Sequence, residues 1–312
     1  MIVILEKKVL IFGFGRMGVS HALQICGLLR SRGVEFQISI IETSIVAKLV
    51  AKSIFCGKVH FKSLNQLMSL PADYFDYAVD ATPPFERVRN RQLLERISKR
   101  YLIEKPLRTK IGQNGQSGYV LQHNPLIDDL KRQLQGVNLS GIEVALKTNL
   151  VFKEEEGWRS GKNGGVVNEF LGHLLSVPFA CLSPLKSLKV ECVTHKPGLV
   201  DVLLTSELYP IRLVFEYGCS NVRKSTYNWR FYGHNAEIVT YDCYQIGSSF
   251  PNLNESHSIA TLGVAKEFYL RGFDFCSQAV SLIDGQGDKM GTKQLECIDS
   301  IISGVLEMVT EK

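Results

Sequence analysis

Three spaced glycines lie between an apolar run and an amphipathic stretch near the start of the chain. Residues 8–12, KVLIF, are followed at once by GFGRMG and then by VSHALQICGLLR, whose apolar residues recur at helical spacing. This order predicts a strand, a tight turn and a helix. In such a turn Gly13 permits the sharp bend, Gly15 lets the backbone approach a pyrophosphate, and Gly18 lets the helix pack closely on the strand. A glycine-rich turn that binds nothing is the alternative.

An acidic residue ends the second expected strand. FQISIIE, at 36–42, has the apolar composition of a buried strand and finishes in Glu42. An acid at this distance from the glycines accepts hydrogen bonds from the adenosine ribose of a dinucleotide and repels a 2′-phosphate. We therefore expect dinucleotide binding and favour NAD. Ser44 and the lysines further along the chain keep NADP open as the alternative.

Candidate strands and helices alternate through the first part of the chain. DYAVDAT at 76–82, YLIEKPL at 101–107 and SGYVLQ at 117–122 are candidate strands, and 86–100 has the pattern of a charged helix. Such alternation predicts an α/β fold with a doubly wound parallel sheet, that is, an N-terminal Rossmann domain.

The pattern changes after residue 122, where we place a domain boundary. Residues 1–122 are expected to form the NAD(P)-binding Rossmann domain, and 123–312 a C-terminal α+β domain for substrate binding and oligomerisation. IRLVFEY at 211–217 and TYNWRFY at 226–232 alternate apolar and polar residues, which predicts a large, mostly antiparallel open sheet covered on one face. Its other face is expected to meet another subunit. Helices are expected at 165–182, 264–283 and 291–309.

Composition excludes several classes of protein. A net charge of +5 over 312 residues is too dilute to indicate a nucleic-acid partner, and no apolar run is long enough to cross a membrane. The first residues lack the pattern of a signal peptide, and the eight cysteines show neither metal-site nor disulfide-framework spacing. These features predict a cytoplasmic protein with reduced thiols, no metal and a small-molecule partner.

Several motifs in chain order resemble the glucose-fructose oxidoreductase, inositol dehydrogenase and MocA (Gfo/Idh/MocA) superfamily of oxidoreductases. KVLIFGFGRMGVSH, DYAVDATPP and YLIEKPL carry the resemblance in the first part of the chain. GYVLQHNP at 118–125 is similar to the family's sixth strand and exit into the second domain. GWRSGKNGGVVNEFLGHLLS at 157–176 is similar to its glycine-rich entry to the catalytic helix.

The resemblance implies an enzyme that moves a hydride between NAD(P) and a secondary hydroxyl or ketone of a sugar, cyclitol or sugar derivative. It also implies a homodimer or homotetramer built through the C-terminal sheet. Besides the three glycines and Glu42, the cofactor-binding residues that it implies are Phe14, Arg16, Met17, Thr43, Ala81, Thr82, Pro83, Pro84, Glu104 and Lys105.

Three residues are candidates for the catalytic machinery. Lys105 matches the lysine of the family's EKP motif, while Glu169 and His173 match an acid and a histidine four residues apart on its catalytic helix. A histidine can accept the hydroxyl proton, a lysine can stabilise the developing alkoxide, and a carboxylate one turn away can orient the imidazole. A solvated strand end for Lys105 and an ordinary helix pair for the other two residues are the alternatives.

Other residues give weaker signals. Gln122, Trp158, Arg159 and Asn168 are candidate substrate contacts. Glutamate at 169, leucine at 171 and glutamine at 122 depart from the family pattern, where aspartate, glycine and arginine are common. Arginines and lysines are dense over 86–110, either as a solvated helix face or as a contact for an anionic or nucleotide-linked substrate.

Two other functions fit the same motifs. The first is a non-catalytic regulator that binds a dinucleotide or sugar, and the second is a lyase, epimerase or glycosidase that uses NAD transiently.

Overall fold

The chain folds into two compact units. The structure, a computed structural model, describes residues 6–151, 165–182, 188–222, 225–234, 238–243, 245–248, 257–258 and 272–310. The first unit is Met1–His123 with Arg271–Asp288, and the second is Asn124–Leu270 with Lys289–Lys312.

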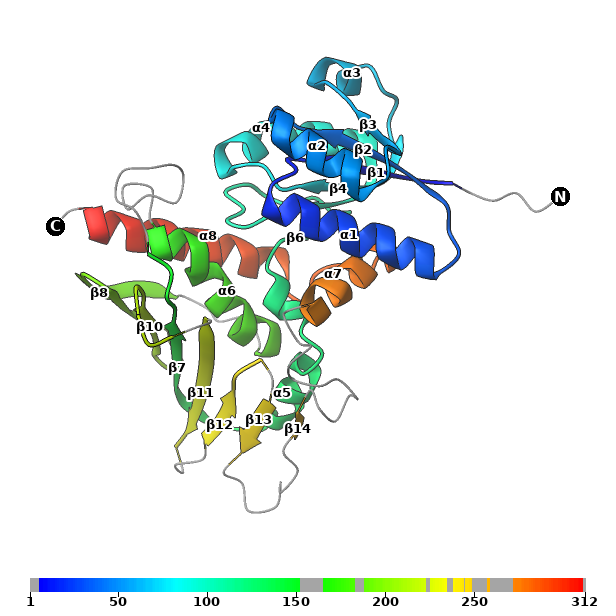
Figure 1. Ribbon diagram of the computed structural model, residues 1–312. Helices are drawn as coiled ribbons and strands as arrows, with labels where there is room; N and C mark the ends of the chain where they lie inside the picture. Colours follow the sequence, from blue (N-terminus) through cyan, green and yellow to red (C-terminus); the bar gives the residue numbers. More distant parts are fainter. Residues whose placement is uncertain are drawn as a thin grey trace. The chain divides into compact units, whose positions relative to one another are not determined.

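A six-stranded parallel sheet forms the centre of the first unit (Figure 1). Its strands are β1 (Lys7–Phe12), β2 (Phe36–Ile41), β3 (Val59–Phe61), β4 (Phe75–Asp80), β5 (Ser98–Ile103) and β6 (Gly115–Ser117). Their order, β3-β2-β1-β4-β5-β6, is that of a Rossmann fold. Successive strands are added toward one edge of the sheet from β1 to β3 and toward the other edge from β4 to β6, so the strand order reverses between β1 and β4. The prediction of a doubly wound parallel sheet is confirmed.

Helices connect these strands. They are α1 (Arg16–Ser31), α2 (Ile45–Ile54), α3 (Leu64–Met68) and α4 (Pro84–Ile97). Serine side chains begin two of them, since Ser44 caps α2 and Ser63 forms a capping box with Gln66 at α3.

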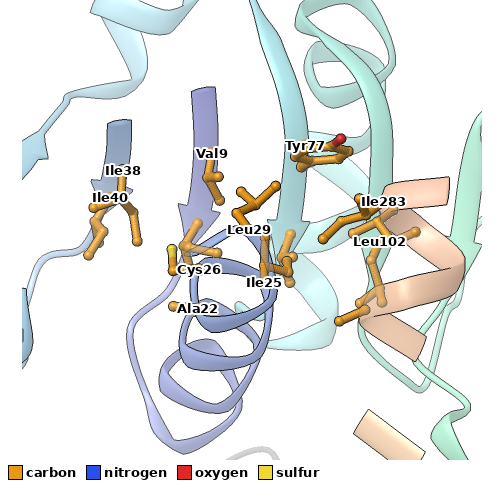
Figure 2. Packing of buried hydrophobic residues seen from close by; sticks show 14 of the residues in the cluster. Val9, Ala22, Ile25, Cys26, Leu29, Ile38, Ile40, Tyr77, Leu102 and Ile283 are labelled. Carbon is orange, nitrogen blue, oxygen red and sulfur yellow. The ribbon is translucent and has the colours of Figure 1, made fainter. Parts of the chain in front are cut away.

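One layer of the first unit is an apolar core between the sheet and α1. In Figure 2, Ala22, Ile25 and Leu29 of α1 lie against side chains from β1, β2 and β4. The apolar residues of α1 face the sheet because they recur every three or four positions. Val9 and Ile38 of the same cluster are at most 1% exposed.

A helix from late in the chain completes this layer. Helix α7 (Gly272–Asp284) contributes Leu282 and Ile283 to the same core, and it lies beside α1 (Figures 1 and 2). Asp284 accepts two hydrogen bonds from the Arg32 guanidinium, at 2.6 and 3.0 Å. The expected division at 122 assigned these residues to the second domain. The structure differs because the apolar face of α7 packs on the first sheet.

The segment predicted as a strand over 117–122 is mostly not one, and this prediction is corrected. Pairing with β5 ends at Ser117, and Val120–His123 form a 3-10 helix, η1. Gly118 lies very close to Glu104, the residue that follows β5, and a Cβ on Gly118 would lie 2.6 Å from Glu104 Cα. The chain therefore turns away from the sheet at Gly118.

The second unit contains an eight-stranded mixed sheet. Its strand order is β14-β13-β12-β11-β7-β10-β9-β8, with only β7 and β10 parallel among the described pairs. The strands are β7 (Leu139–Lys147), β8 (Lys189–Lys196), β9 (Leu199–Thr205), β10 (Ile211–Glu216), β11 (Thr226–Gly233), β12 (Ile238–Tyr241), β13 (Gln245–Ser248) and β14 (His257–Ser258). The predicted, mostly antiparallel sheet is confirmed.

Alternation divides this sheet into a buried face and an open one. Ile211, Leu213 and Phe215 of β10 are fully buried, while Arg212 between them is exposed. On the open face Arg212 pairs with Asp201 at 2.6 Å, and Arg230 pairs with Glu143 at 3.3 Å.

Helices cover the buried face. They are α5 (Ile127–Leu134), α6 (Gly165–Cys181) and α8 (Thr292–Thr310), and α6 and α8 lie side by side (Figure 1). The strand β8 contacts α8 where Gly304 leaves room for Val190. Within the described ranges, none of the helices combines the length and the apolar character needed to span a membrane.

Candidate functional site

The predicted cofactor residues of the first unit gather at one edge of its sheet. Gly13, Glu42, Ala81 and Glu104 directly follow β1, β2, β4 and β5, and the carboxyl ends of parallel strands meet at the same edge. Backbone bonds hold this edge together, since Gly13 N donates to Ile41 O and Ala81 N donates to Phe12 O. The edge includes the point between β1 and β4 where ligands of such folds bind.

Two of the three glycines are required by the protein's own packing. Gly13 has a φ of +77° and lies against Ala81, whose carbonyl oxygen would be 3.1 Å from an added Cβ. Gly18 is more constrained, because a Cβ there would lie 1.9 Å from the Gly13 carbonyl oxygen. The close approach of α1 to the turn therefore depends on Gly18.

Gly15 is different, because none of the described residues requires a glycine there. Apart from its chain neighbours, no heavy atom of the described residues lies within 4 Å of a Cβ added there. Gly15 is the N-cap of α1, no side chain caps this helix, and its first turn contains no acid. Arg16, the next residue, is exposed. The amides and the positive end of the helix dipole are thus open to an anion.

Glu42 is held by backbone amides. One carboxylate oxygen accepts from Phe14 N at 2.7 Å, and the other accepts from Thr43 N at 2.7 Å and from Ser44 N at 2.8 Å. The carboxylate therefore links the end of β2 to the glycine turn. A carboxylate has about four acceptor positions, so these three bonds leave it able to accept a further hydroxyl.

A buried carboxylate that the motif analysis did not single out lies at the end of β4. Asp80 is fully buried and accepts from Thr82 N at 3.0 Å, from Thr82 Oγ1 at 2.5 Å and from Asn90 Nδ2 at 3.0 Å. Burial raises the pKa of Asp80, although these hydrogen bonds oppose the shift. The network fixes the Ala81–Thr82 turn. The sequence signal that could have identified Asp80 is an acidic residue at the end of an apolar strand.

A second buried pair supports the segment that carries Lys105. His21 Nε2 of α1 lies 2.6 Å from Glu104 Oε1, and Glu104 Oε2 accepts from Lys105 N at 3.1 Å. Burial alone would raise the pKa of Glu104, but the hydrogen bond and charge of His21, with the charges of Lys105 and Arg87, hold it below its ordinary value. Lys105 itself is 8% exposed, and its peptide bond to Pro106 is cis.

Arg87 of α4 fixes the same segment through its backbone. Its guanidinium donates to Glu104 O at 2.6 Å, to Pro106 O at 3.1 Å and to Thr82 O at 2.6 Å. The strand ends of β4 and β5 are thus joined through one buried side chain. Sequence reasoning placed Arg87 in a positive stretch and missed this role.

Other members of that positive stretch also bind the protein itself. Arg96 donates to the carbonyls of Met68 and Leu70 at the end of α3, and Arg100 donates to the carbonyl of Ile283 at the end of α7. These contacts favour structural roles over a shared contact with an anionic substrate.

The second unit carries the other catalytic candidates on α6. Glu169 and His173 lie one turn apart, with 8% and 6% of their surfaces exposed, and Asn168 is 4% exposed. Lys105 belongs to the first unit and His173 to the second.

The remaining substrate candidates have different outcomes. Gln122 is fully buried and donates to Ser117 Oγ and Asp288 Oδ1, both at 2.9 Å. These bonds favour a structural role for Gln122, and its contact with substrate stays a prediction. Trp158 and Arg159 lie outside the described residues.

Two further observations concern ligands. A hollow of about 600 Å³ in the first unit is lined by Arg30, Phe36, Phe55 and Lys58 among others, and by none of the predicted site residues. Among the described residues, no three histidine, cysteine, aspartate or glutamate side chains are grouped closely enough to hold a metal ion.

Solved structures resemble the chain over almost its whole length. Levoglucosan dehydrogenase, in complex with NADH and L-sorbose, has a TM-score of 0.75 at 10% identity, covering 98% of this chain and 97% of that chain. An oxidoreductase domain protein from Kribbella flavida has a TM-score of 0.74 at 14% identity, covering 98% and 97%. The chain shares their fold.

A third structure extends the comparison. An oxidoreductase from Agrobacterium radiobacter, in complex with NAD+, L-tartaric acid and magnesium, has a TM-score of 0.70 at 11% identity and covers 98% of this chain and 97% of that chain. No protein-family model and no curated protein matches the chain by sequence.

Proposed function

We propose that the protein is an NAD-dependent dehydrogenase or reductase that interconverts a secondary hydroxyl and a ketone on a sugar, cyclitol or sugar derivative. The observation that carries the proposal is the turn after β1, where Gly15 leaves space beside the uncapped amino end of α1 at the reversal point of the sheet. The solved structures with this fold include proteins described with NADH, L-sorbose and levoglucosan, which supports the same class.

The residues of the first unit fit a dinucleotide. The turn from Gly13 to Gly18 and the first amides of α1 would bind the pyrophosphate, and the remaining acceptor position of Glu42 would bind a ribose hydroxyl. A 2′-phosphate would meet the Glu42 charge, so NAD is preferred over NADP. The bound nicotinamide would supply hydride acceptance or donation.

The chain's own side chains would handle the substrate proton. In the direction of oxidation, His173 would take the hydroxyl proton and Lys105 would stabilise the oxygen as negative charge develops. Glu169, one turn from His173, would orient the imidazole or bind another hydroxyl. Asn168, Trp158, Arg159 and Gln122 remain candidate substrate contacts.

A first experiment separates a phosphate cradle from a glycine turn that binds nothing. Gly15→Ala should keep the stability of the native chain within about 1 kcal/mol, because the protein leaves room for the methyl group. It should lose NADH affinity in a calorimetric titration, because the methyl group occupies the space for the pyrophosphate. Gly27→Ala, in the same helix and equally unobstructed, is the matched control and should bind NADH normally. Equal NADH binding by all three proteins would contradict the proposal.

A second experiment tests the chemistry. NADH formation is measured with a panel of sugars, cyclitols and uronates in the native protein, in Lys105→Met and in His173→Asn. Both variants should lose turnover, and His173→Asn should retain NADH binding. Cofactor binding without turnover on any substrate would favour the non-catalytic regulator instead, and bound NAD with substrate conversion but no net NADH would favour a lyase, epimerase or glycosidase.

We also propose that the protein forms a homodimer or homotetramer through the open face of the second sheet. That face carries Arg212, Arg230 and Lys147, each paired with an acid on a neighbouring strand. Half-buried Ala145 and Val214 lie on the same face, and covering them with a second copy would bury apolar surface.

A further inference from the structure

Helix α6 contains a proline, Pro178, that interrupts the backbone hydrogen bonding of the helix. The carbonyl affected belongs to the residue that follows His173. Pro178 lies inside the helix and has no backbone N–H. In a regular helix the N–H of residue 178 would donate to the carbonyl of residue 174. The Leu174 carbonyl therefore loses its usual helix donor. Because Leu174 is fully buried, its carbonyl needs a partner from the protein.

The neighbouring sheet supplies that partner. Trp229 Nε1, from β11, donates to Leu174 O at 2.9 Å. Indole has a single polar group, a donor, so this bond is the whole polar contribution of Trp229. The bond joins the middle strand of the sheet to the turn of α6 that carries His173.

The surroundings of Trp229 hold the indole rigidly. Its ring is fully buried, stacks on Tyr227 with centroids 5.9 Å apart and planes within 7°, and contacts Tyr241 with centroids 5.2 Å apart. On the helix side, Ser176 Oγ donates to the carbonyl of His173 itself at 2.7 Å. Two consecutive carbonyls, of residues 173 and 174, are thus bonded by side chains.

We propose that Trp229 is a positioning residue for His173: its indole N–H replaces the helix donor that Pro178 lacks and fixes the turn of α6 from which His173 extends. The role of His173 in proton transfer rests on the proposed function. The positioning role rests on the geometry of the second unit alone.

The pair of residues allows a rescue experiment. Trp229→Phe keeps an aromatic ring in the core but removes the indole donor together with part of the ring volume, and a separate control accounts for the lost volume. Pro178→Ala returns a backbone N–H to the helix and makes the indole donor redundant. Trp229→Phe should displace His173, and the double variant Trp229→Phe/Pro178→Ala should restore it. A residue that only fills the core would show no such rescue.

The readout is His173 itself. The chain has seven histidines, and the Cε1–H signal of His173 is assigned by its loss in His173→Gln. That signal should move in Trp229→Phe and return toward its native position in the double variant. With a substrate that the native protein converts, kcat should fall by up to about a hundredfold in Trp229→Phe, with KM nearly unchanged. In the double variant kcat should recover.

A matched control removes core volume without touching a donor. Phe231→Leu changes a fully buried residue two positions further along β11. It should lower the thermal midpoint and leave the His173 signal in place. A native His173 signal in Trp229→Phe, or a displaced signal that Pro178→Ala fails to restore, would overturn the proposal.

A further measurement does not depend on the folding of Trp229→Phe. In Pro178→Ala alone, the new helix N–H competes for the Leu174 carbonyl, so the indole ¹H–¹⁵N signal of Trp229 should move upfield and exchange faster with solvent. An unchanged indole signal would also overturn the proposal. Loss of NADH binding or of His173-dependent turnover would contradict the proposed function while leaving these spectra informative.

Discussion

At the scale of single residues, the glycine turn could be predicted from sequence, but its supports could not. Spacing distinguishes Gly13, Gly15 and Gly18 as a set, whereas the structure shows that only Gly15 is unconstrained by the protein. His21 and Arg87 escaped prediction because their partners, Glu104 and the backbone around it, are distant in the sequence. Such pairings arise only when α1 and α4 pack on the sheet.

Glu42 is expected to determine the choice between NAD and NADP. Glu42→Ala removes the charge and exposes the amides of Phe14, Thr43 and Ser44, which can then bind a 2′-phosphate. The ratio of NADPH to NADH affinity should rise by about tenfold or more, which corresponds to about 1.4 kcal/mol. Calorimetric titration with each cofactor measures the ratio. Glu35→Ala, an exposed acid just before β2, is the control, and an unchanged ratio in Glu42→Ala would contradict the assignment.

Stability in acid should depend on Glu104. Its pKa in the folded protein lies below the ordinary value of 4.5, so the carboxylate stabilises the fold above that pH, and this contribution disappears as the pH falls through the lowered pKa. The free energy of unfolding of the native protein should therefore decrease below about pH 4.5. Glu104→Gln should be less stable at neutral pH and show a shallower decrease in acid. Denaturant titrations at a series of pH values measure this, and parallel curves would exclude the role.

At the scale of elements, long periodic segments were predictable and short ones were not. α6 and α8 fall within a residue or two of their expected positions because their apolar patterns are long. β3 has only three residues, too few for a pattern, and it was missed. Residues 120–122 have the apolar composition of a strand, but the packing of Gly118 prevents continued pairing and they lie in η1 instead.

The position of α7 is a tertiary effect with a measurable signature. Leu282 is 3% exposed within the core of the first unit, so Leu282→Ala should lower stability by about 2–5 kcal/mol. Hydrogen exchange should accelerate in β1 and α1 rather than in β7 and β10. Equal acceleration in both sheets would show that α7 does not belong to the first unit. Leu208→Ala, at an exposed position, is a control that should change neither the stability nor the hydrogen exchange of the protein.

At the scale of the whole molecule, the open face of the second sheet bears on assembly. Val214 lies on this face in β10, half-buried beside the paired charges. The native protein should sediment as a dimer or tetramer, and Val214→Glu should sediment as a monomer, because a charge would be buried in the contact. The same substitution should leave NADH affinity unchanged. A monomeric native protein would contradict the proposed assembly.

On the ribosome, the first unit remains incomplete until the chain has been synthesised past residue 288. Until then the nascent chain holds β1, β4 and β5 without the side chains of α7 that cover Tyr77 and Leu102. An uncovered apolar surface of this kind is a binding site for chaperones and a route to aggregation. Most of the second unit is therefore synthesised before the first unit is complete, so the first unit cannot finish folding ahead of the second during synthesis.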